Sequence, residues 1–171
     1  MLFVHTTQKL AKATRMRLDP APIGLNLSWI DCWYANLFAL HNDGDAILMT
    51  NTDTLYSFII PVSSKSLALF GILDAFRIKL ASALEANEAS ESVIAYVNDR
   101  LQRYTVCKTA NRSVLGTMNE MIFSAQYFVT QRPEYTIEDI EASLNEMPLG
   151  PLKYQFSTER FRELVGTLQG T

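Results

Sequence analysis

The chain has 171 residues, of which 48% are hydrophobic and 19% are charged. These values exclude intrinsic disorder as the overall description and favour a folded chain with a self-sufficient core. Its 15 basic and 18 acidic side chains give a net charge of −3, which excludes a strongly basic nucleic-acid binder. No apolar run approaches the ~20 residues of a membrane span, and the first residues lack a signal-peptide pattern, so we expect a cytoplasmic protein without a membrane partner.

A strand and a short helix are the first predicted elements. The apolar run Leu2–Thr6 favours a strand. Thr6 or Thr7 can cap a helix over Gln8–Met16, because a threonine hydroxyl accepts an N–H that the first turn leaves unpaired. The segment Asp19–Gly24 contains two prolines and a glycine and predicts a loop.

An antiparallel meander of three strands is predicted next. Its segments are rich in apolar and aromatic residues, and they are Trp33–His41, Ala46–Thr50 and Leu55–Ile60. Asp43-Gly44 is a strong hairpin signal because both positions tolerate positive φ. Asn51-Thr52-Asp53 predicts the second turn, and Pro61 is expected to end the third strand.

The remaining elements are predicted to be helices and one more strand. Helices are indicated where a residue that can cap a helix N-terminus is followed by apolar residues at a spacing of three and four. The helices cover 69–84, 91–101, the residues from 111 or 112 to Pro133, 136–147 and the residues from Ser157 to Gly166. Their expected caps include Ser63 or Ser64, Thr136 with Asp139, and Ser157, while Arg103–Thr109 alternates as a strand does.

This order of elements favours an α+β fold. An antiparallel or mixed sheet, built on the three-stranded meander, is expected to pack with several helices. We divide the chain into a core domain, residues 1–133, and a C-terminal helical extension, residues 134–171, that packs on the core.

Common motifs of metal and phosphate chemistry are missing from the sequence. The cysteines and histidines, His5, Cys32, His41 and Cys107, form no CxxC, HxxxH or HExxH pair, whereas a zinc site needs three or four converging ligands. GxGxxG, GxxxxGK and GxSxG stretches are also missing. We therefore expect no metal, no cofactor and two free thiols.

One candidate anion site lies where the predicted strand 103–109 meets the long helix. A helix N-terminus presents free N–H groups and a partial positive charge, so it binds anions readily. Lys108 and Arg112 would add full charges, and Asn111 and Ser113 would add hydrogen bonds. The alternative is that Asn111 and Ser113 only cap the helix while Arg112 points into solvent.

A second strand-to-helix junction, at His5-Thr6-Thr7-Gln8-Lys9, follows the same logic. The imidazole of His5 titrates near neutral pH, which makes this residue the candidate general base, and Lys9 is a candidate ligand for an anion. The alternative is a histidine whose hydrogen bonds are satisfied within the strand and a lysine on the surface. If both junctions lie at one edge of the sheet, their positive ends converge.

Charges of opposite sign gather in two segments. Residues 1–18 hold Lys9, Lys12, Arg15 and Arg17 and no acid, whereas residues 134–146 hold five acids and no base. A basic helix face can contact nucleic acid. The alternatives are a solvated face or pairing between the two segments.

Four asparagines form a third candidate group. Asn36 lies within an apolar strand and Asn51 at a strand end, and with Asn111 and Asn119 they could line one pocket beside Trp33 and Tyr56. The alternative is turn chemistry for Asn51 and Asn111 and a solvent-facing Asn36.

Four segments of the chain resemble a known family signature: MLFVHTTQKL (1–10), WYANLF (33–38), TNTDTLYS (50–57) and KTANRSVLGTMNEM (108–121). They are similar to an uncharacterised bacterial domain-of-unknown-function family of small proteins, which is distantly similar to the third-open-reading-frame proteins of pRi-type plasmids. The block Asn111–Asn119 is the most specific part. The resemblance implies a bacterial, cytoplasmic protein linked to mobile elements, and it implies no particular reaction.

These observations lead to one main hypothesis of function and two alternatives. The main hypothesis is a binding module for an anionic ligand, a nucleotide or a nucleic-acid backbone, at the two junctions. The first alternative is a small enzyme acting on a phosphorylated or acyl substrate, with His5 as general base and Arg112 as electrostatic stabiliser. The second is a protein-interaction module of a mobile-element or phage-defence system, which uses the acidic segment to bind a protein partner.

Overall fold

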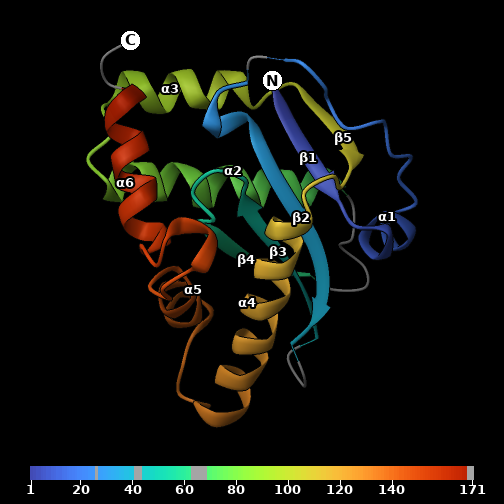
Figure 1. Ribbon diagram of the computed structural model, residues 1–171, viewed down its shortest axis with the longest axis vertical. Helices are drawn as coiled ribbons and strands as arrows, with labels where there is room; N and C mark the ends of the chain where they lie inside the picture. The colour runs from blue at the N-terminus through green and yellow to red at the C-terminus, as the bar shows by residue number, and fades with distance from the viewer. Residues whose placement is uncertain (26, 41–43, 63–68, 169–171) are drawn as a thin grey trace.

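A computed structural model describes residues 1–25, 27–40, 44–62 and 69–168 of the chain, without the side chains of residues 69 and 70. The described residues form a mixed sheet with helices on both faces (Figure 1), which confirms the α+β class. The strands are β1 (Leu2–Thr6), β2 (Cys32–Ala39), β3 (Asp45–Asn51), β4 (Ser57–Val62) and β5 (Tyr104–Lys108). The helices are α1 (Gln8–Thr14), η1 (Trp29–Asp31), α2 (Leu69–Ala86), α3 (Glu91–Arg100), α4 (Arg112–Gln131), α5 (Ile137–Asn145), η3 (Gly150–Leu152) and α6 (Ser157–Leu168).

The sheet combines the predicted meander with a parallel half. Its strand order is β4-β3-β2-β1-β5, and β2, β3 and β4 pair in antiparallel fashion as expected. β1 runs parallel to both of its neighbours, with His5 opposite Cys107 and Thr6 opposite Lys108. The C-terminal ends of β1 and β5 therefore lie side by side, and each is followed directly by a helix.

Two hydrophobic cores lie on the two faces of the sheet because strand side chains alternate between the faces. On one face, strand residues such as Val4 and Trp33 pack with α1, α2, α3 and α6. On the other face, strand residues such as Phe38 and Leu48 pack with α4 and α5. Helices α5 and α6, which belong to the predicted C-terminal extension, thus contribute buried residues to both cores.

The outer edge of β4 is covered by side chains of α5. Asn145 Oδ1 accepts the N–H of Ser57 at 2.8 Å, and Glu141 Oε1 accepts the N–H of Ile59 at 2.6 Å. The outward-facing N–H groups of this edge strand are thus paired, which blocks pairing with another chain.

Pro61 lies inside β4, so the prediction that it ends the strand is wrong. Every second residue of β4 directs its main-chain N–H away from β3, as Ser57 and Ile59 do. Position 61 continues this series. A proline at this position removes no hydrogen bond of the sheet, which is why an edge strand tolerates it.

Most predicted caps are confirmed. Thr7 caps α1, Asn111 caps α4, and Thr136 and Asp139 form a capping box on α5. Ser90 caps α3, a cap that is not among those predicted from the sequence. The predictions for His41, Asp43, Ser63 and Ser64 lie outside the described residues.

Some predicted helix ends differ from the structure. Ser157 is the first residue of α6 rather than its cap, and its hydroxyl donates to the main-chain oxygen of Asn145 at 3.0 Å. Gly166 does not close α6, which continues to Leu168. Helix α1 ends at Thr14, two residues early, because Arg15 adopts a left-handed conformation with φ 57°.

Candidate functional site

The two predicted junctions meet at one edge of the sheet. His5 is paired with Cys107, and Thr6 is paired with Lys108, because β1 and β5 run parallel. Because side chains along a strand point alternately to the two faces of the sheet, the side chains of the two junctions do not all lie on one face. The His5 ring stacks on Tyr34, which belongs to the core beneath α4, whereas Lys108 lies beside α1. The edge therefore carries a histidine cluster on one face and a basic surface on the other.

His5 is a buried member of a small polar cluster. Its ring stacks on the Tyr34 ring with centroids 4.6 Å apart, and its Nδ1 lies 3.1 Å from the main-chain oxygen of Lys108 and 3.5 Å from Cys107 Sγ. Burial lowers the pKa of His5, and the hydrogen bond to Lys108 offsets part of this shift. Burial raises the pKa of the Cys107 thiol to about 11. Near neutral pH the pair is an uncharged imidazole and a protonated thiol, unlike the low-pKa thiolates of reactive cysteines.

Protonation of His5 is expected to destabilise the folded chain. The unfolded chain takes up a proton as the pH falls through the ordinary histidine pKa of 6.5, whereas the folded chain resists until a lower pH. The free energy of unfolding should therefore decrease as the pH is lowered from 7 to 5, and His5→Gln should remove part of that decrease. Urea denaturation at several pH values measures the effect. An unchanged slope in His5→Gln would contradict the assignment to His5.

The N-terminus of α4 is satisfied by the protein itself. Asn111 Oδ1 accepts the N–H groups of Ser113 at 2.9 Å and Val114 at 3.3 Å. The hydroxyl oxygen of Tyr34 accepts those of Ala110 at 3.2 Å and Asn111 at 2.7 Å. These main-chain donors are thus occupied by capping and by Tyr34, while the side chains of Arg112 and Ser113 are exposed. The capping alternative describes the observed geometry of Asn111.

The predicted asparagines occupy different places. Asn51 is fully buried, and its amide bonds to main-chain atoms around the β3–β4 turn and the start of β2. Asn36 Oδ1 accepts a hydrogen bond from the hydroxyl of Thr7 at 3.0 Å, which places it beside the first junction. Asn119 is exposed on α4. The structure brings Asn36 and Asn111 to the edge where the junctions meet and leaves Asn51 beside Trp33, nearer the start of β2.

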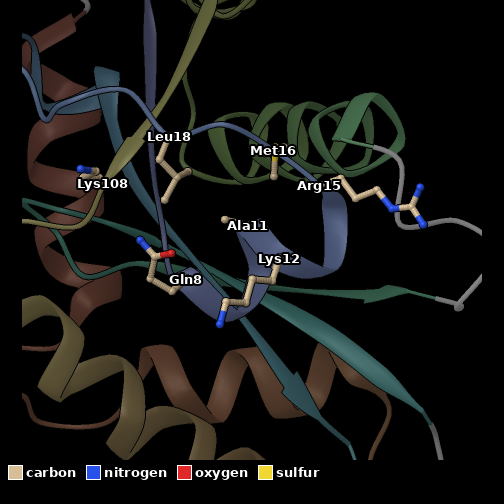
Figure 2. A pocket seen from close by; sticks show the side chains of 7 residues that line it. All are labelled: Gln8, Ala11, Lys12, Arg15, Met16, Leu18 and Lys108. Carbon is tan, nitrogen blue, oxygen red and sulfur yellow. The ribbon is translucent and has the colours of Figure 1, made fainter.

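A basic depression lies on the α1 side of this edge. It has a volume of about 420 Å³ and is lined by Gln8, Ala11, Lys12, Arg15, Met16, Leu18 and Lys108. Figure 2 shows Ala11, Met16 and Leu18 around its middle, with Lys108, Lys12 and Arg15 on different sides of them. The depression therefore combines an apolar floor with a cationic rim. Lys9 is exposed on α1, but it is not one of the lining residues.

No carboxylate forms an ion pair with the rim cations within the part of the chain that the structure describes. None of the lining residues is a carboxylate, and no ion pair among the described residues involves Lys12, Arg15 or Lys108. The ion pairs of the acidic helix α5 go to α2 instead: Lys79 lies 2.7 Å from Glu141 and 3.9 Å from Glu138. The predicted pairing of the basic and acidic segments is therefore not seen for the rim cations.

Main-chain geometry holds the rim in place. Arg15 caps the C-terminus of α1 in a left-handed conformation, and its N–H bonds to the main-chain oxygens of Ala11 and Lys12. Asp19 then pairs with the outer edge of β5, donating its N–H to Val106 and accepting the N–H of Lys108 at 2.9 Å. The segment that carries Met16 and Leu18 is thus fixed at both ends. Sequence reasoning missed these two floor residues, because loop residues between a helix end and an isolated bridge show no periodicity.

The described residues contain neither a metal-binding cluster nor a membrane-spanning helix. Among them, no group of three or more histidines, cysteines and carboxylates is placed to hold a metal ion. None of the helices in that part of the chain combines the length and the apolar character that crossing a membrane requires.

Comparison with known proteins identifies the chain at the level of a family only. No curated protein and no solved structure matches it. One family model, described as "Domain of unknown function (DUF6933)", matches residues 3–160 and so covers most strands and helices of the fold. This chain therefore belongs to the DUF6933 family.

Proposed function

We propose that this protein binds a small anionic ligand of the nucleotide class at the basic depression. The observation that carries the proposal is the meeting of Lys12, Arg15 and Lys108 around one apolar-floored cavity with no carboxylate partner in the described part of the chain. Cations placed together without counter-charges repel one another, and a bound anion relieves that repulsion.

The form of the cavity favours a small molecule over an extended polyanion. Its volume of about 420 Å³ lies within the ~300–1,000 Å³ typical of small-molecule sites. The floor of Ala11, Met16 and Leu18 offers apolar contact to a flat ring, and the rim offers charge to a phosphate. A nucleic-acid backbone would use the rim and leave the floor without a partner.

Removal of two rim charges is expected to weaken nucleotide binding. Each exposed charge contributes about 0.5–1 kcal/mol, so Lys12→Ala combined with Lys108→Ala should raise the dissociation constant for AMP or ATP roughly tenfold. Isothermal titration calorimetry at low salt measures this effect. Lys153→Ala, which removes an exposed lysine outside the cavity, is the matched control and should leave binding unchanged.

Additional arms of the experiment separate the ligand classes. Leu18→Ser should weaken AMP but leave inorganic phosphate unaffected, because only the nucleotide reaches the apolar floor. Wild-type protein that binds single-stranded DNA, with steep salt dependence, but binds no nucleotide would overturn the proposal in favour of a nucleic-acid backbone. Unchanged AMP binding in the double variant would show that the ligand site is elsewhere.

The family resemblance of the sequence also predicts where the protein occurs. A bacterial origin, a cytoplasmic location and a link to mobile elements stay predictions that rest on the segments around Asn111–Asn119. Binding of a nucleotide by a small protein is compatible with all three.

A further inference from the structure

One side chain of the basic depression differs in its chemistry from the others that line it. The three rim cations carry only hydrogen-bond donors, whereas the amide of Gln8 carries both donors and an acceptor. The floor residues Ala11 and Leu18 carry neither, and the thioether of Met16 is only a weak acceptor. Among the described residues that line the depression, Gln8 Oε1 is therefore the one strong side-chain acceptor that a ligand can meet.

The amide of Gln8 is available to a ligand. The side chain is exposed and makes no hydrogen bond with another residue in the part of the chain that the structure describes. Figure 2 shows the amide directed into the space between Ala11, Leu18 and Lys108. A flat ring that lies on the apolar floor therefore brings its edge to this amide.

The main chain that carries Gln8 is tied to the sheet. Gln8 begins α1 directly after Thr7, whose N–H donates to the main-chain oxygen of Ala35 at 3.1 Å and whose hydroxyl donates to Asn36 at 3.0 Å. Gln8 and Arg15 both line the depression and lie two helical turns, roughly 10 Å, apart along α1. The same stretch of chain thus offers an amide at one end and a cation at the other, the two contacts that a base and a phosphate need.

We propose that Gln8 is the specificity-determining residue of the basic depression, with its Oε1 accepting an N–H group from the base of the bound nucleotide. This inference rests on the nucleotide binding proposed above, and it names the feature that the site selects, a base with a hydrogen-bond donor on its edge, such as adenine. Glutamine side chains pair with the N6 and N7 atoms of adenine in protein–DNA complexes, so the two groups are complementary. An inorganic phosphate satisfies the cations but leaves the amide without a base to contact.

AMP and purine riboside 5′-monophosphate are matched probes because they differ only in the amino group at C6. In isothermal titration calorimetry on the full chain, loss of this amino group should weaken binding about fivefold, the effect of one hydrogen bond. Gln8→Met keeps the length of the side chain and removes the amide. It should therefore weaken AMP about fivefold but purine riboside 5′-monophosphate less than about twofold, and leave inorganic phosphate unchanged.

Two controls separate a loss of recognition from a loss of structure. Gln131→Met removes an exposed glutamine at the end of α4 and should change none of the three affinities. Gln8→Met should keep the melting temperature of the wild type, because the site is exposed and the two residues have similar helix propensities.

The outcomes distinguish this inference from the proposed function on which it rests. The role of Gln8 alone is overturned if Lys12→Ala combined with Lys108→Ala weakens AMP but Gln8→Met does not. It is also overturned if Gln8→Met weakens AMP and purine riboside 5′-monophosphate equally. A wild-type protein that binds no AMP would overturn both the role of Gln8 and the proposed function.

Discussion

Replacement of Asn51 by alanine is expected to lower the free energy of unfolding by about 3 kcal/mol, because it leaves several partly buried main-chain groups without partners. The side chain is fully buried. Its Nδ2 donates to the main-chain oxygens of Trp29 at 2.9 Å and Cys32 at 3.3 Å. Its Oδ1 accepts the N–H groups of Asp53 and Thr54 and the Thr54 hydroxyl. The melting temperature should fall by about 6–12 °C in a calorimetric scan.

Two further variants make the Asn51 prediction specific. Asn51→Asp keeps the acceptor and loses both donors, and it also places a carboxylate against two main-chain oxygens, so it should destabilise the chain as well. Asn119→Ala is the matched control because Asn119 is exposed on α4, and it should change the stability by less than about 0.5 kcal/mol. If Asn51→Ala behaved like Asn119→Ala, the turn would not depend on this amide.

Replacement of Asn145 by alanine is the second change with a large expected effect, a loss of about 2–3 kcal/mol. Asn145 Oδ1 accepts the N–H of Ser57 at 2.8 Å, and Nδ2 donates to the main-chain oxygen of the same residue at 2.8 Å. The Ser157 hydroxyl donates to the same Oδ1 at 3.0 Å. One buried amide thus joins α5, the edge of β4 and the start of α6.

The loss of Asn145 also uncovers part of a sheet edge. An unpaired edge strand can pair with a second chain, so Asn145→Ala should aggregate at a lower temperature than its melting point predicts. Chemical denaturation measures the stability, and light scattering during heating measures the association. Glu146→Ala removes the exposed next residue and is the matched control. A melting point within 1 °C of the wild type, roughly the resolution of such a scan, would contradict the role assigned to Asn145.

The two asparagines show how far the sequence predicts the importance of a residue. Asn51 stands at the end of an apolar strand and before a Thr-Asp turn, so its local sequence indicates turn chemistry. Asn145 lies near the end of a predicted amphipathic helix, and nothing nearby distinguishes it from a solvent-facing residue. Its partners are 88 and 12 positions away along the chain, and only the folded arrangement brings them together.

Some features of the candidate site are likewise predictable from local sequence, and others depend on the fold. Thr7 and Asn111 are predictable caps because a helix N-terminus needs a side-chain acceptor within a few residues. The closeness of the two junctions depends on β1 pairing in parallel with β5 across more than 100 residues, which local patterns do not specify. The separation of His5 from Lys108 then follows from the strand alternation, which sends neighbouring residues to opposite faces of the sheet.

The sequence by itself determined the α+β class, the three-stranded meander and the caps of α1, α4 and α5, because apolar periodicity and capping chemistry act over a few residues. Only the tertiary structure decided the mixed strand order, the tolerance of Pro61 in an edge strand and the pairing of Glu141 with Lys79. The same holds for the basic depression, whose Lys12 and Arg15 are more than 90 residues from Lys108 along the chain. Such arrangements arise from packing between segments that are distant in sequence, and no local sequence pattern indicates them.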